Sequence, residues 1–177
     1  MNDYFWIFPL IFIFHDMEEV IGLRLWIEKN KSLIAERFPR ILKTYQDFST
    51  EGFAAAVYEE LILCILISLF CVITQNSIIH DIWLGAFIGC TIHFAIHILQ
   101  TCILRMYIPA TITSIICLPV SVFIILKCLG QIGNLSVATA CWIIAGMIVT
   151  GINLIFAQKL IGWFTRLASK CKKNKKA

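Results

Sequence analysis

The stretch from Leu61 to Val72 reads LILCILISLFCV and contains no charged residue. It lies within the apolar segment Gly52–Thr74, which has the roughly 20 residues that a helix needs to cross the hydrocarbon core of a bilayer. A strand of a membrane β-barrel would alternate between polar and apolar residues, and this stretch does not. An open sheet would leave its backbone groups unpaired in lipid. The stretch therefore predicts a transmembrane helix.

Similar segments occur along the whole chain. Of its 177 residues, 59% are hydrophobic and 15% are charged, whereas soluble domains carry roughly a quarter charged residues. The N-terminal segment lacks a basic start and a cleavage site, so we expect it to be retained as a first span rather than removed as a signal peptide. We expect one all-α membrane domain over 1–177, a bundle of five transmembrane helices. The predicted spans are 4–26, 52–74, 82–104, 107–126 and 135–157, followed by a basic tail over 159–177.

The positions of Lys and Arg predict an orientation. If the chain crosses the membrane five times, fourteen of its fifteen basic residues fall on one side, because they gather in the loop after the first span and in the tail. By the positive-inside rule, we expect the N-terminus outside and the C-terminus in the cytoplasm of a cell membrane. This distribution fits an anionic lipid surface better than nucleic acid. Apolar residues spaced through Glu28–Ser49 predict an interfacial amphipathic segment between the first two spans.

The first predicted span contains the sequence His15-Asp16-Met17-Glu18-Glu19. Each ionisable group near the bilayer centre costs about 2.5–3.5 kcal/mol, so such a cluster indicates a function. Glu18 and Glu19 follow His15 at i+3 and i+4, so both carboxylates are expected to share the histidine's face, with Asp16 pointing elsewhere.

Two later spans add polar residues at matching depth. The second span carries Glu59 and Glu60, and the third carries His93 and His97 one helical turn apart. Glu19, Glu59 and His97 each lie seven residues from the expected cytoplasmic end of their span, about 10 Å deep at 1.5 Å per residue. We therefore expect these groups to meet in one layer.

Histidine and glutamate together are ligands for zinc, iron or manganese, and a metal ion would neutralise carboxylates gathered in apolar surroundings. We predict a divalent transition metal, zinc or iron, as one ion or two. Glu19 and Glu60 are the candidate catalytic carboxylates. The candidate ligands are His15, Glu18, Glu19, Glu59, Glu60, His93 and His97. As alternatives, the glutamates could be protonated packing elements or a proton relay.

The fifth predicted span carries a stripe of small and polar residues. Gly146, Thr150 and Asn153 lie along one side of this segment. Small residues let membrane helices approach closely, so we interpret the stripe as a packing face, with Asn153 as an interhelical hydrogen-bonding residue rather than a metal ligand.

These motifs resemble the HXXEE domain family of small prokaryotic membrane proteins. The resemblance rests on His15 to Glu19, on an acidic residue at Glu59 or Glu60, on the His93 and His97 pair, and on the segment 107–110. It implies a membrane-bound, metal-dependent enzyme. The chain is also similar to the CAAX-type glutamyl intramembrane proteases, but it departs from their EExxxR motif, because Arg24 stands one position too late.

The sequence leaves several functions open. We favour a membrane-embedded, metal-dependent hydrolase acting on a lipophilic or membrane-associated substrate, because a metal-bound water and a spare glutamate suffice for hydrolysis. The alternatives are a di-metal oxidase or hydroxylase, a CAAX-like protease, a proton-coupled transporter, and a structural protein whose polar centre only orders the bundle. The expected partners are the bilayer and the substrate, without nucleic acid, and nothing in the sequence indicates an oligomeric state.

Overall fold

The computed structural model of the protein describes residues 2–37, 39, 48–133 and 135–174, and its regular structure in these ranges is helical throughout. This confirms the all-α fold class. A short 3-10 helix at Asn2–Tyr4 precedes the α-helices. These are α1 (Ile7–Lys29), α2 (Lys31–Arg37), α4 (Thr50–Thr74), α5 (Ser77–Leu104), α6 (Thr111–Ile132) and α7 (Val137–Asn174).

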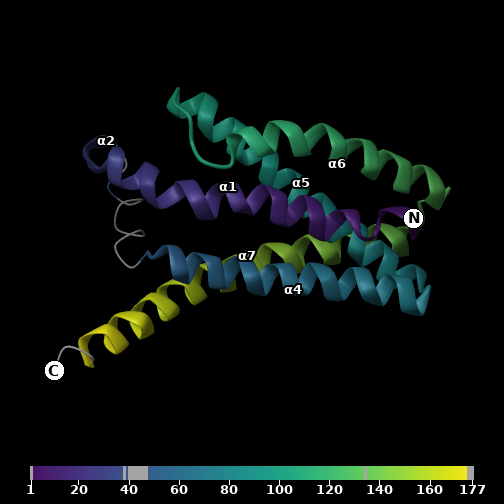
Figure 1. Cartoon of the computed structure of the whole chain (residues 1–177). Coiled ribbons are helices and arrows are strands. Elements are labelled where there is room, and N and C mark those ends of the chain that lie inside the picture. The colour runs from purple at the N-terminus through teal and green to yellow at the C-terminus, as the bar shows by residue number, and fades with distance from the viewer. Residues whose placement is uncertain (1, 38, 40–47, 134, 175–177) are drawn as a thin grey trace.

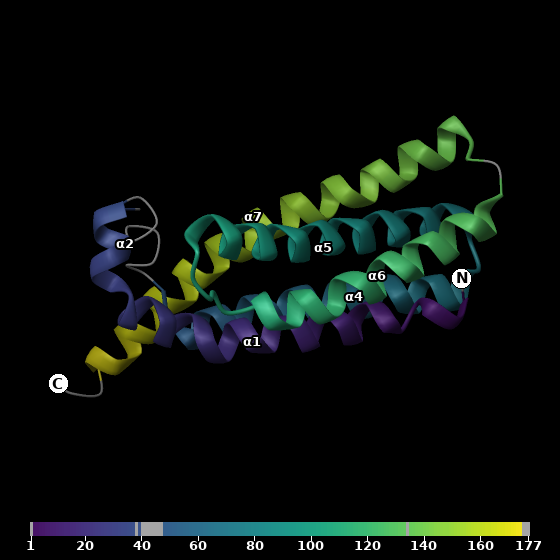
Figure 2. The same cartoon turned by 90° about the horizontal axis from the view of Figure 1, so that it is seen from above.

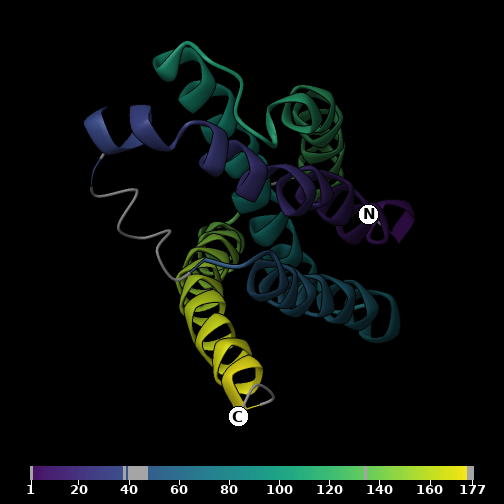
Figure 3. The same ribbon diagram turned by 60° about the vertical axis from the view of Figure 1, so that its left-hand side comes forward.

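The five long helices lie side by side along one axis, and the chain termini lie at opposite ends (Figure 1). α5 packs most extensively, against α7 and α6, while α4 packs against α7 and α1. Figure 2 shows α5 between α7 and α6. The C-terminal part of α7 extends beyond the rest of the bundle (Figure 3).

Four helices of the described chain are long and apolar enough to cross a membrane: α4, α5, α6, and α7 over Val137–Ala168. The prediction of five such helices is not supported. α1 has 23 residues, a sufficient length, but it carries Asp16, Glu18, Glu19 and Arg24 within its apolar sequence. By length and composition the protein is thus a membrane protein with four candidate spans.

Two helices differ in extent from the predicted spans. α6 begins at Thr111 instead of residue 107, because a proline disfavours helical geometry in the residue before it, and Pro109 is followed by Ala110 in the left-handed region with φ 82°. α7 continues to Asn174 instead of ending at residue 157, because Lys and Arg are good helix formers and a loss of hydropathy alone does not end a helix.

The predicted interfacial segment is described only in part. α2 lies in the first half of the segment and buries Ile34, which is 2% exposed. Residues 38 and 40–47 of that segment lie outside the described residues. Its contact with a membrane surface stays a prediction.

α5 and α7 approach each other so closely that glycine is required at the contact. A Cβ on Gly85 would lie 1.9 Å from the carbonyl oxygen of Ile143, and one on Gly146 would lie 2.2 Å from the carbonyl oxygen of Ile82. The packing face predicted around Gly146 is therefore confirmed. It fixes α5 against α7, while Phe87 and Phe94 lie on the side of α5 that contacts α1.

Candidate metal centre

α1 and α5 face each other through a row of aromatic and imidazole rings. The ring centroids of Phe8 and Phe87 are 5.3 Å apart, and those of His15 and Phe94 are 4.5 Å apart. Both pairs are 79 residues apart in the chain, so the two helices run parallel in a constant register. The turn of α1 that follows His15 is therefore level with the turn of α5 that follows Phe94.

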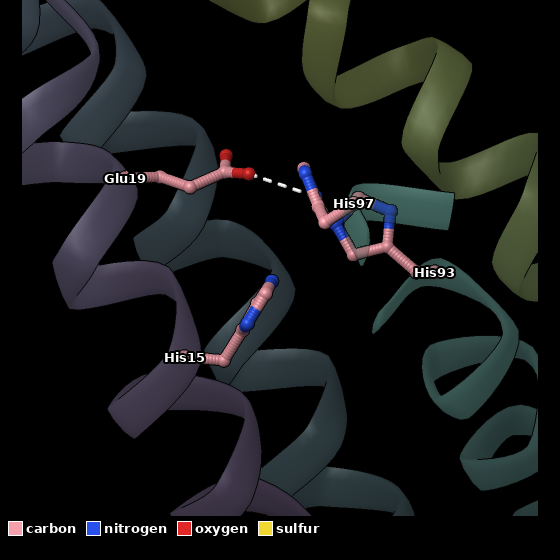
Figure 4. Close-up of side chains that lie close together, drawn as sticks. All are labelled: His15, Glu19, His93 and His97. Carbon is pink, nitrogen blue, oxygen red and sulfur yellow. Dashed lines mark hydrogen bonds and ion pairs between the residues drawn. The ribbon is translucent and has the colours of Figure 1, made fainter. Parts of the chain in front are cut away.

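This register brings together four of the seven predicted ligands. His15 and Glu19 of α1 and His93 and His97 of α5 each offer one ligand atom, and these atoms lie within 4.8 Å of one another. Figure 4 shows the side chains pointing toward one another from the two helices. His15, Glu19 and His97 are buried and His93 is half-buried. The group is thus largely enclosed by protein.

Three of the four residues are linked directly. The Nε2 atom of His97 lies 2.9 Å from Oε1 of Glu19 and 2.8 Å from Nε2 of His93. Nε2 of His15 is buried and has no hydrogen-bond partner, and the same holds for Nδ1 of His97. An unpaired polar atom in an apolar interior carries a desolvation cost, so the orphaned nitrogen of His15 requires an explanation.

A metal ion accounts for this arrangement better than protons do. A single proton on Nε2 of His97 would have to serve both Glu19 and His93, and Nε2 of His15 would still have none. A cation accepts lone pairs from all four groups at once. Ligands of tetrahedral zinc at 2.0–2.2 Å stand about 3.4 Å apart, which is within the spread of these atoms. The residues therefore fit a transition metal.

Glu18 lies apart from this group. Its Oε2 accepts hydrogen bonds from the backbone N–H of Thr113 at 2.8 Å and from the Thr113 hydroxyl at 2.7 Å. Its Oε1 accepts the hydroxyl of Tyr107 at 2.5 Å and the N–H of Ile112 at 3.4 Å. Because Ala110 supplies no side-chain cap, the carboxylate of Glu18 caps the start of α6 from another helix. Its role as a metal ligand stays a prediction.

The loop between α5 and α6 is held against α1. The indole N–H of Trp26 donates to the carbonyl of Tyr107 at 2.6 Å, and Gly22 lies directly beside Pro109. Burial, followed by the hydrogen bond to Glu18, raises the pKa of the Tyr107 phenol to about 12. The phenol therefore stays protonated near neutral pH and remains a donor to Glu18.

The acidic pair of α4 stands beside the group without joining it. Oε2 of Glu59 accepts a hydrogen bond from the side-chain amide of Asn153 at 3.4 Å, which links α4 to α7. Glu60 is half-buried and interacts electrostatically with Glu59, Glu19 and Asp16. Asp16, which the sequence predicts to point away from the histidine's face, is 5% exposed. Metal ligation by Glu59 or Glu60 stays a prediction.

Thr113 is a site residue that the sequence patterns do not reveal. A threonine near the start of an apolar span is common and carries no signal by itself. One feature was nevertheless readable: adjacent residues such as Glu18 and Glu19 point about 100° apart on a helix of 3.6 residues per turn. This angle indicates that one of the two glutamates serves a different partner.

The fold and this group define the class: a helical membrane protein with a buried His/Glu group that could hold a metal ion. The chain belongs to the family described as a protein of unknown function with HXXEE motif, whose family model matches residues 6–124. The matched range extends from the start of α1 into α6 and includes the four grouped residues, Glu18 and Thr113. No curated protein and no solved structure matches the chain.

Proposed function

We propose that the protein is a metal-dependent membrane enzyme, a hydrolase that acts on a lipophilic or membrane-associated substrate. The observation that carries this proposal is the convergence of three imidazoles and one carboxylate from two helices, with the buried Nε2 of His15 lacking a partner. Histidine and carboxylate are the ligands of many catalytic zinc and non-haem iron sites. We favour a single ion, because the described residues contain one such group.

In this proposal the three histidines hold the ion through Nε2, and Glu19 and Glu60 handle protons. Three protein ligands leave a position open for water or substrate, as in catalytic zinc sites. A bound divalent ion lowers the pKa of a water ligand and polarises a carbonyl or phosphoryl oxygen. The carboxylate of Glu19, within 4.8 Å of the three ligand nitrogens, is the proposed general base. Glu60, which interacts electrostatically with Glu19, is the proposed second proton acceptor.

The proposal includes a placement in the cell membrane with five crossings, the N-terminus outside and the C-terminus in the cytoplasm. α1 would be the fifth crossing helix, and its 23 residues extend about 34 Å at 1.5 Å per residue. It buries His15, Asp16 and Glu19 against protein rather than lipid, which reduces the cost of carrying them into a bilayer. The clustering of basic residues after α1 and in the tail supports this orientation.

Metal content tests the centre directly. We expect the protein, purified in detergent without chelators, to carry close to one zinc or iron ion per chain by mass spectrometry. His15→Ala, His93→Ala and His97→Ala should each lose it. His80→Ala is the matched control, because the fourth histidine packs on Phe5 and contacts the Cys71 carbonyl instead. Full metal content in two of the three site variants would refute the centre.

Turnover and flux distinguish a hydrolase from a transporter. We expect the wild-type protein in liposomes to cleave ester, amide or phosphoester bonds of added membrane lipids, as followed by mass spectrometry of the products. Glu60→Gln should lower turnover while metal content is retained. Proton flux that is abolished by Glu60→Gln, without lipid cleavage by the wild type, would contradict the hydrolase and favour the proton-coupled transporter.

A further inference from the structure

We propose that Glu18 acts through Thr113 as a positioning residue, holding the His15 ring so that Nε2 faces the metal. The proposal rests on the proposed metal centre and gives the two glutamates of the motif separate roles. Glu19 lies beside the three histidines and is the proposed general base. Glu18 instead supports the ring of one proposed ligand, His15, through Thr113.

The contacts form a chain from α1 to α6 and back to α1. The Thr113 hydroxyl lies 2.7 Å from Oε2 of Glu18 and 3.2 Å from Nδ1 of His15. The hydroxyl is buried, and so is the imidazole. One threonine oxygen therefore connects the carboxylate of Glu18 to the ring of His15.

The hydrogen-bonding capacity of Thr113 determines the direction of these bonds. A hydroxyl has one proton to donate and can accept through its lone pairs. The shorter contact is to the Glu18 carboxylate, and a bond to an ionised acceptor is the stronger one, so the proton is donated there. The hydroxyl can then only accept from His15. It lies nearer to Nδ1, at 3.2 Å, than the Ser114 hydroxyl does at 3.5 Å, so we place the imidazole proton on Nδ1. Nε2 is left with a free lone pair, and this is the nitrogen that is buried without a partner.

Glu18 is itself held firmly enough to act as an anchor. The Tyr107 hydroxyl and two backbone N–H groups at the start of α6 also donate to its carboxylate. The partial positive charge of a helix N-terminus stabilises a carboxylate there. Metal-binding histidines commonly donate their second N–H to an oxygen acceptor that fixes the tautomer and ring orientation, and loss of that acceptor typically costs 10- to 100-fold in metal affinity. Thr113 is such an acceptor.

The experiment measures Zn²⁺ affinity by competition with a chromogenic chelator and records the absorption spectrum of the Co²⁺-loaded protein. Thr113→Val keeps the shape of the side chain and removes the hydroxyl, and Thr113→Ser restores a hydroxyl. Glu18→Gln keeps an acceptor oxygen but removes the charge. Thr101→Val is the matched control, because it makes the same change at a hydroxyl of α5 that contacts Thr111 and neither Glu18 nor His15.

We expect Thr113→Val to bind Zn²⁺ roughly 10- to 100-fold more weakly and to change the Co²⁺ spectrum. Thr113→Ser should recover most of the affinity, Glu18→Gln should be intermediate, and Thr101→Val should keep the wild-type affinity and spectrum. If Thr113→Val does not fold, unchanged affinity and spectrum in Glu18→Gln overturn the proposal. Wild-type affinity and spectrum in Thr113→Val overturn it while the metal centre stands, whereas the absence of metal binding by the wild-type protein overturns both.

Discussion

A single methyl group placed between α5 and α7 tests the packing that positions the histidines of α5. In Gly146→Ala the new Cβ would lie 2.2 Å from the carbonyl oxygen of Ile82 and 3.0 Å from the backbone nitrogen of Ala86. Both neighbours are backbone atoms, so no side-chain rotation relieves the clash. Ordinary contact begins at 3.4 Å, so the two helices must separate locally by about 1.2 Å.

The cost follows from that separation. A gap of about 0.5–1 Å removes a quarter to a half of the dispersion energy between the atoms on its two sides. Overpacking of this kind lowers the free energy of unfolding by about 1–3 kcal/mol. We take the upper end of that range, because the obstacle is backbone. Replacing a helical glycine with alanine stabilises the helix by about 1 kcal/mol, because alanine has the higher helix propensity. The expected net loss for Gly146→Ala is about 2 kcal/mol of unfolding free energy.

The assay is equilibrium unfolding in mixed detergent micelles, followed by circular dichroism. Gly151→Ala is the control, because Gly151 lies on the same helix and a Cβ there meets nothing within 4 Å. This control should be at least as stable as the wild-type protein. A Gly146→Ala protein as stable as the Gly151→Ala control would show that α5 and α7 are not in the close contact described here.

Three further outcomes are expected. Addition of a chelator should lower the melting temperature, because a ligand at 100 times its Kd adds about 2.7 kcal/mol to the free energy of unfolding. An unchanged melting temperature in chelator would contradict a bound metal. Asp16→Asn should retain full metal content by mass spectrometry, because Asp16 is outside the group of four although it is buried; loss of metal would make it part of the centre. Trp26→Phe should cost about 1 kcal/mol in the same unfolding assay through loss of the hydrogen bond to the Tyr107 carbonyl, and no change would mean that this bond contributes nothing.

The helices and the level of the site were readable from the sequence because both depend on local properties. Long apolar runs predict membrane helices, and a rise of 1.5 Å per residue converts sequence position into depth. That conversion aligned Trp26 with Leu104, an offset of 78 residues, and the ring contacts of α1 and α5 show an offset of 79. The convergence of His15 and Glu19 with the histidines of α5 followed from it.

The glutamates have different partners because each one faces a different helix. The depth of a residue along a helix does not specify its direction around the helix axis. Glu59 therefore has the predicted depth of the histidines, but its side chain contacts Asn153 of α7. Glu18 and Glu19 are neighbours in sequence, but their side chains leave α1 about 100° apart and reach different helices. A pattern within one helix cannot specify the partner on the other side.

By itself, then, the sequence determined the helical fold and four apolar helices long enough to cross a membrane, and it placed the polar residues of α1 and α5 level with one another, because hydropathy and helical rise act within a segment. Only the tertiary structure decided that α6 starts at Thr111, that Glu18 caps it, and that Glu19 joins three histidines. These outcomes depend on the rotation and register of helices distant in the chain, which are set by contacts such as Gly146 on Ile82 and Phe8 on Phe87. Close packing allows few such arrangements, and the one that forms selects the partner of each carboxylate.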